Sequence, residues 1–132
     1  MKLKGILFFV CFSLFSTAFA ANVHTYPNSG DTKGQVAYPR FCEIEIINHS
    51  RHDVRVFGVF DDGTALTPFT VYGYDAPHYI SLFYYGYCHD GMDLYINTLR
   101  GGYPVYSGYT PRATTVYILP GSMPTAVLKN KA

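Results

Sequence analysis

The 132-residue sequence contains no tryptophan, few charged residues and only three cysteines. Charged residues make up 14% of the chain and the formal net charge is +1, so no basic stripe is available to neutralise a nucleic-acid backbone. Apolar residues reach 48%, which is too high a share for a disordered chain. A chain of this length has room for one domain with a hydrophobic core. We therefore expect a single folded domain that does not bind nucleic acid.

The sequence also lacks a hydrophobic run long enough to cross a membrane as a helix. The run from Ile6 to Phe15 has about ten residues, whereas a bilayer of roughly 30 Å needs about twenty. Two lysines precede this run, and Ala18-Phe19-Ala20 follows it with the small residues that signal peptidase requires. Residues 1–20 are therefore predicted to be a cleaved secretory signal peptide. The protein is predicted to be exported, either to the periplasm or out of the cell, with no transmembrane segment after cleavage.

One of the three cysteines, Cys11, lies in the predicted signal peptide and would be removed with it. Cys42 and Cys88 remain in a chain directed to an oxidising compartment, which favours a disulfide between them. The alternative makes Cys88 a nucleophile assisted by His89. Neighbouring residues on a strand point to opposite faces, and Cys42 would oxidise a catalytic thiol. We therefore predict a structural disulfide.

No segment after residue 40 has a convincing helical period. Strand-like runs instead recur about every eight to twelve residues, separated by turn residues such as Asp61-Asp62-Gly63. Apolar and polar residues alternate from Cys42 to Ile46 and again from Met92 to Asn97. This spacing predicts an all-β fold, a small antiparallel β-sandwich of immunoglobulin-like size with one disulfide. A small β-barrel is the alternative.

The positions of prolines and glycines, which interrupt regular secondary structure, indicate the domain boundaries. Residues 21–40 contain two prolines and two glycines without a sustained period, and are predicted to be an extended N-terminal arm or linker with a short strand at Gln35–Tyr38. Residues 41–132 are predicted to be a single β-sandwich domain. Its last strand is expected to end at Leu119, before Pro120, leaving a polar tail.

The run from Ile80 to Cys88 carries bulky side chains on both faces, so simple alternation fails there. Either this strand is buried on both sides, or its second face, with Tyr85 and Tyr87, is a binding surface. Gly86 is consistent with a bulge that resets the register.

Tyrosine is the strongest compositional bias: 13 in the chain, ten of them from Tyr72 to Tyr109. Tyrosine offers a large contact area at low entropic cost together with a hydroxyl group. High β-propensity explains single tyrosines, but so many rings cannot all be buried. We predict a tyrosine-rich surface that recognises a protein or a glycan. Six residues are assigned to it: Tyr84, Tyr85, Tyr87, Tyr103, Tyr106 and Tyr109.

Motifs for catalysis or metal binding are weak. His49, His52 and Asp53 have a spacing that suits a divalent metal, but no further ligand is identifiable and turn residues explain them as well. Glu43 and Glu45 share a strand face that the alternation places in water, where a carboxyl pKa shifts little. The prediction is a binding protein with no catalytic activity, no cofactor and no metal site.

Two alternatives remain open. A small secreted hydrolase would use histidines and carboxylates, and would bring together four histidines: His49, His52, His78 and His89. A structural subunit of an envelope or secretion complex would present an exposed strand edge for pairing with another chain.

Overall fold

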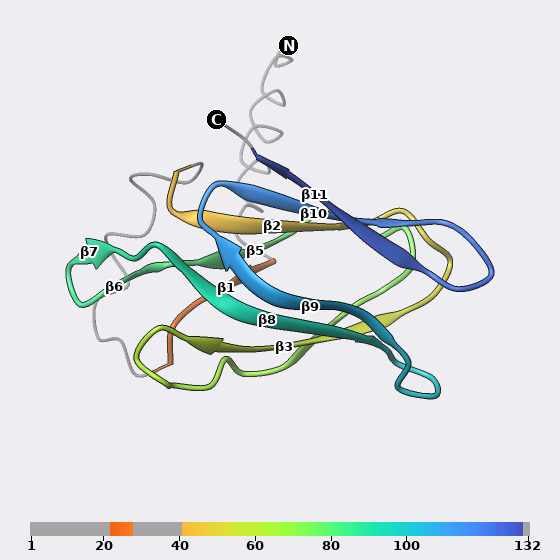
Figure 1. Cartoon of the computed structure of the whole chain (residues 1–132), viewed down its shortest axis with the longest axis horizontal. Helices are drawn as coiled ribbons and strands as arrows, with labels where there is room; N and C mark the ends of the chain where they lie inside the picture. Colours follow the sequence, from red (N-terminus) through yellow and green to blue (C-terminus); the bar gives the residue numbers. More distant parts are fainter. Residues whose placement is uncertain (1–21, 28–40, 131–132) are drawn as a thin grey trace, which may run out of the picture.

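Two β-sheets packed face to face make up the domain (Figure 1). The structure is a computed structural model and describes residues 22–27 and 41–130. These described ranges contain no helix, and hence none that could cross a membrane. The predicted all-β sandwich is confirmed, and the sheets stay separate instead of closing into the alternative barrel. The predicted signal peptide and the predicted strand at Gln35–Tyr38 lie outside the described residues.

The first sheet has five strands in the order β1-β5-β2-β10-β11. Their bounds are β1 (Val23–His24), β2 (Glu43–Asn48), β5 (His78–Ser81), β10 (Thr114–Leu119) and β11 (Thr125–Asn130). Within this sheet β2 is antiparallel to β5 but parallel to β10, and β1 is parallel to β5. The first sheet is therefore mixed.

The second sheet is antiparallel throughout, with the order β4-β3-β8-β9. Its strands are β3 (Val54–Phe60), β4 (Phe69–Val71), β8 (Gly91–Thr98) and β9 (Pro104–Pro111). Strands β6 (Phe83–Tyr84) and β7 (Tyr87–Cys88) form a separate small hairpin at one end of the sandwich.

The core lies between the two sheets and follows the predicted alternation. In β2, β3 and β8 every second side chain is fully buried, and each such aliphatic side chain contributes roughly 1.5–3 kcal/mol by leaving water. The predicted turn at Asp61-Asp62-Gly63 also forms, with the Gly63 amide donating to the Phe60 carbonyl at 2.8 Å. The alternation of apolar and polar residues was sufficient to predict the buried positions of these strands, because one face of each strand packs in the core and the other faces solvent.

The run from Ile80 to Cys88 departs from the single strand that was expected. The chain reverses at Tyr85-Gly86, where φ is 56° and 82°. Positive φ at both central residues is the geometry of a two-residue hairpin, so Gly86 is a turn residue and not a bulge. Tyr84 consequently pairs with Tyr87 across the hairpin.

Both ends of the described chain hold more strand than expected. Residues 125–130 form β11 against β10, where a polar tail was predicted, because its mostly exposed side chains give no alternation to detect. Near the N-terminus, Val23 and His24 pair with Tyr79 and Ile80, and Tyr26 is buried. Part of the segment predicted as an arm is therefore built into the sandwich.

The predicted disulfide between Cys42 and Cys88 is confirmed, with the two Cα atoms 5.7 Å apart. It joins the residue before β2 to β7, and so ties the β6–β7 hairpin to the first sheet.

Replacing both Cys42 and Cys88 with serine should lower the free energy of unfolding by about 2–4 kcal/mol, because the unfolded chain loses a covalent constraint across 46 residues. Urea denaturation of the oxidised protein and of the double variant measures the difference. An unchanged midpoint would contradict a stabilising role for this bridge.

Candidate binding surface

The structure separates the six tyrosines that were predicted to form one surface. Tyr85 and Tyr87 lie exposed on the β6–β7 hairpin, and Tyr109 lies exposed on β9 at the same end of the sandwich. Tyr103 is also exposed but sits in the turn between β8 and β9, at the opposite end (Figure 1).

The remaining two tyrosines face the core, which corrects their assignment to the surface. The Tyr84 side chain is 1% exposed. Tyr106 lies opposite the buried Ile96, packs against the core, and its hydroxyl is 2.8 Å from the Thr110 hydroxyl. The high tyrosine content alone could not distinguish these buried rings from the exposed ones, because tyrosine is favoured on both the core face and the solvent face of a sheet.

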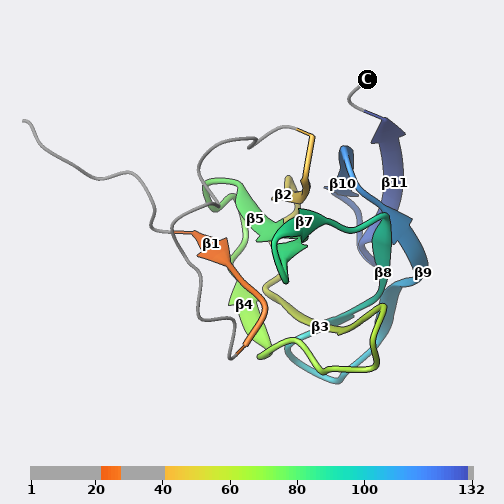
Figure 2. The ribbon, with the colours of Figure 1, turned by 90° about the vertical axis from the view of Figure 1, so that its left-hand side faces the viewer.

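A stack of four rings organises the end of the sandwich that carries the β6–β7 hairpin. Tyr84 stacks on Tyr26 with ring centroids 4.1 Å apart, and on its other side it stacks on His89 at 3.6 Å. Tyr87 continues the stack, 4.0 Å from His89. Tyr85 packs edge-on against Tyr26 and Tyr84. We call these five residues the aromatic end; Figure 2 looks onto it, with β7 near the centre.

Hydrogen bonds fix the aromatic end in place. The Tyr26 hydroxyl donates to the Asp62 carboxylate at 2.6 Å and lies 2.9 Å from the Tyr85 hydroxyl. The bond to Asp62 raises the pKa of Tyr26 and lowers the pKa of Asp62. The exposed Tyr85 ring is therefore held by a side chain that belongs to the core.

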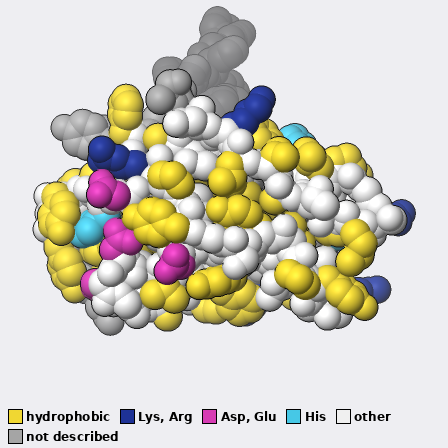
Figure 3. Space-filling view, in the orientation of Figure 1, with side chains coloured by type: hydrophobic (Ala, Val, Ile, Leu, Met, Phe, Trp, Pro, Cys, Tyr) yellow, Lys and Arg dark blue, Asp and Glu magenta, His cyan; other side chains and the backbone are white. Residues whose placement is uncertain are grey.

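Acidic residues lie beside these rings, together with the exposed Arg112, whose amide donates to the Asp90 carbonyl at 2.8 Å. Four exposed aspartates lie in the turns and strand ends here: Asp61, Asp62, Asp90 and Asp93. Partial burial, followed by the charge of Asp61, raises the pKa of Tyr109, whose hydroxyl donates to that carboxylate at 3.4 Å. Figure 3 shows acidic side chains beside hydrophobic ones at the end where β6 and β7 lie in Figure 1. Aromatic faces and carboxylates thus share one surface.

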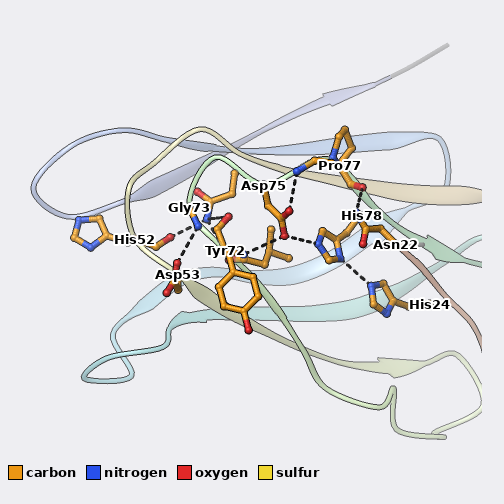
Figure 4. A network of polar contacts seen from close by, with 12 residues as sticks. Asn22, His24, His52, Asp53, Tyr72, Gly73, Asp75, Pro77 and His78 are labelled. Carbon is orange, nitrogen blue, oxygen red and sulfur yellow. Dashed lines mark hydrogen bonds and ion pairs between the residues drawn. The ribbon is translucent and has the colours of Figure 1, made fainter. Parts of the chain in front are cut away.

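Away from this surface, two histidines and an aspartate form a hydrogen-bonded chain (Figure 4). His24 Nε2 is 2.9 Å from His78 Nδ1, and His78 Nε2 is 3.0 Å from Asp75 Oδ2. The His24 ring also stacks on Phe69 with centroids 3.4 Å apart. Burial, reinforced by the neighbouring His78, lowers the pKa of His24 to about 4. These hydrogen bonds anchor β1 to the sheet, and the surroundings favour the neutral form of the His24 ring.

The other histidines have separate surroundings. His49 stacks on Tyr117, His89 lies between Tyr84 and Tyr87, and His52 sits in the loop before β3. No group of three or more His, Cys, Asp or Glu within residues 22–27 and 41–130 could hold a metal ion. The four histidines that a hydrolase would bring together are therefore distributed among different contacts.

Two members of the aromatic end, Tyr26 and His89, were not predicted as part of a binding surface. Tyr26 lies in a segment without any period, and its place in the stack depends on β1 pairing with β5. His89 was considered only as a neighbour of Cys88 and as one of the four histidines of a hydrolase. Neither residue carries a local signal for a contact made across the fold.

Comparison of the chain with models of protein families, with curated proteins and with solved structures finds no match.

Replacing Tyr84 with phenylalanine should leave the free energy of unfolding unchanged or raise it by up to about 1 kcal/mol. The Tyr84 hydroxyl is buried without a hydrogen-bond partner among the described residues, so its removal relieves a desolvation cost. Burial also raises the pKa of this hydroxyl to about 12. Tyr84→Ala should instead cost about 3–5 kcal/mol, because it opens a cavity in the stack. Urea denaturation tests both, and a destabilised Tyr84→Phe would reveal a partner for the hydroxyl.

Stability should also fall as the pH is lowered from about 6.5 to about 4. The unfolded chain protonates His24 near 6.5 and the folded chain only near 4, so between these values the unfolded state binds more protons. For a half-buried ring the loss should be about 1–2 kcal/mol, levelling off below pH 4. Urea midpoints of the wild type and His24→Phe, which keeps a ring on Phe69 but cannot titrate, measure it. Equal pH slopes would show that His24 is not responsible.

Proposed function

We propose that the protein is an exported binding protein that recognises basic side chains of a protein partner through the aromatic end. The observation that carries this proposal is the placement of exposed Tyr85 and Tyr87, on a locked stack of rings, beside four exposed aspartates. The disulfide between Cys42 and Cys88 supports export, because such bonds persist in oxidising compartments.

Preorganisation favours binding at this end. An exposed tyrosine normally loses rotamer freedom when it is buried against a partner, which costs about 0.5–1.5 kcal/mol for each side chain. Tyr85 is already held by the Tyr26 hydroxyl, and Tyr87 by stacking on His89. The partner would therefore meet rings whose positions are fixed before contact.

The chemistry of the surface selects positive charge. Lysine and arginine side chains are attracted to the faces of aromatic rings, by about 0.5–1 kcal/mol at exposed sites, and pair with carboxylates. Asp61 and Asp62 lie on one side of the rings in the β3–β4 connection, and Asp90 follows the hairpin. A neutral glycan would use the rings and could donate hydroxyl hydrogen bonds to a carboxylate, but it carries no positive charge to offset four neighbouring carboxylates. A basic protein surface uses both.

The double variant Tyr85→Asn with Tyr87→Thr should bind a short lysine-rich peptide at least about tenfold more weakly than the wild type. Asparagine tolerates the positive φ at residue 85, and threonine suits a strand, so the hairpin should stay folded. The matched control is Tyr72→Thr with Tyr74→Asn, which removes two exposed tyrosines at the other end, one of them also at positive φ. The peptide is titrated into 15N-labelled protein and followed by NMR.

In the wild type, amide shifts should concentrate at residues 83–93 and diminish in about 0.5 M salt, because exposed ion pairs are screened. The control variant should bind as the wild type does. Binding of a neutral N-acetylglucosamine oligosaccharide at the same residues, without salt dependence, would replace the basic partner by a glycan. Shifts confined to other residues would overturn the proposal.

A further inference from the structure

A groove of about 520 Å³ opens at the end of the sandwich opposite the aromatic end. Three separate segments line it: the loop 51–53 before β3, the turn between β8 and β9, and the residues just before β11. In Figure 1 the last two segments are the loops at the right-hand end. We call this cavity the basic groove, because Arg51 and Arg100 both line it.

The turn that carries Arg100 is held by hydrogen bonds to a buried side chain. The buried Thr98 hydroxyl donates to the Arg100 carbonyl at 2.8 Å and accepts from the Tyr103 amide at 2.9 Å. Gly101 and Gly102 adopt φ of 85° and 64°, which allow the chain to reverse beneath these bonds. The wall formed by the β8–β9 turn is therefore fixed in position.

The loop that carries Arg51 is held by the buried side-chain amide of Asn48. Asn48 Nδ2 donates to the His52 carbonyl at 2.8 Å, and Asn48 Oδ1 accepts from the Ser50 amide at 2.9 Å. The Asp53 carbonyl accepts from the Leu99 amide at 2.8 Å, which joins this loop to the β8–β9 turn. Two walls of the groove are thus connected directly.

Three polar side chains of the groove, those of Arg51, His52 and Arg100, have side-chain nitrogen atoms without a partner among the described residues. Within the described part of the chain, neither Arg51 nor Arg100 has an ion pair or a side-chain hydrogen bond. The His52 Nε2 atom is buried and likewise has no hydrogen-bond partner among those residues. Asp53 is the one acidic residue in the lining, and its carboxylate accepts from the Gly73 amide at 2.9 Å (Figure 4). The groove therefore keeps an excess of positive charge.

Apart from Thr98, the rest of the lining is mainly apolar. Leu99, Tyr103 and Met123 are about half exposed, and Pro124 is buried beside them. Their side chains offer contact to an aliphatic or aromatic body but few partners for the hydroxyl groups of a sugar.

We propose that the basic groove binds a carboxylate attached to an apolar body, such as the C-terminal residue of a peptide or a free aliphatic acid. Arg51 and Arg100 hold the carboxylate, since the planar guanidinium matches its two oxygens, and Leu99 and Met123 contact the apolar body. Two arginines against one aspartate suit a single negative charge better than a phosphate dianion. This site is separate from the aromatic end and does not depend on it.

The test uses three probes on 15N-labelled protein: a short peptide ending in free leucine, the same peptide as its C-terminal amide, and hexanoate. The free peptide should shift the amides of residues 98–103, and the amide form should bind at least about tenfold more weakly. If hexanoate binds and the peptide does not, the carboxylate site stands and its source is a free acid. If the free and amidated peptides bind equally, or neither acid shifts residues 98–103, the proposal is wrong.

Arg51→Gln with Arg100→Gln should lose the free-acid response by at least about tenfold. The matched control is Arg112→Gln, an exposed arginine next to β9 at the other end. Tyr85→Asn with Tyr87→Thr should keep the response, so failure here is distinguishable from failure of the proposed function. Unchanged binding in the double glutamine variant, with an otherwise preserved NMR spectrum, would overturn the proposal.

Discussion

The antiparallel pairing of β3 with β8 is the constraint on which both ends of the molecule depend. Its register places Val54 opposite Thr98 and Phe60 opposite Met92. The loops that enter and leave these strands therefore emerge about 20 Å apart, at the rise of a strand. Asp61 and the β6–β7 hairpin gather at one end, and the two arginines of the basic groove at the other. A shift of one residue in this register would turn every core side chain of β3 toward solvent, and neither the aromatic end nor the basic groove would form.

The two ends are made rigid by different interactions. At the aromatic end, stacked rings and a disulfide hold a short hairpin that has few ladder hydrogen bonds of its own. At the basic groove, the buried side chains of Asn48 and Thr98 satisfy backbone groups in the loops. In both cases buried side chains hold exposed residues in place, which would lower the entropic cost of the binding proposed at each end. The near-neutral net charge conceals this separation of acidic and basic residues.

Prediction from the sequence was most successful where burial is one-sided. The alternation in β2 and β8 predicted which residues enter the core, and the pairing of Cys42 with Cys88 was predicted because these are the two cysteines outside the predicted signal peptide. It failed at β11, whose exposure leaves no alternation, and at the β6–β7 hairpin. Residues 84 and 85 of this hairpin are both tyrosine, so the residue types do not show that strand β6 ends at Tyr84 and that the turn begins at Tyr85.

The sequence by itself determined the all-β class, the disulfide and an excess of aromatic rings too large for the core. Only the tertiary structure decided which rings are exposed, because Tyr84 and Tyr85 are neighbours with opposite environments. It also brought Tyr26 into the stack, and Arg51 to the same groove as Arg100. These contacts join segments far apart in the chain. Local periodicity records which face of a strand is covered, but it does not record which residue of another strand covers it.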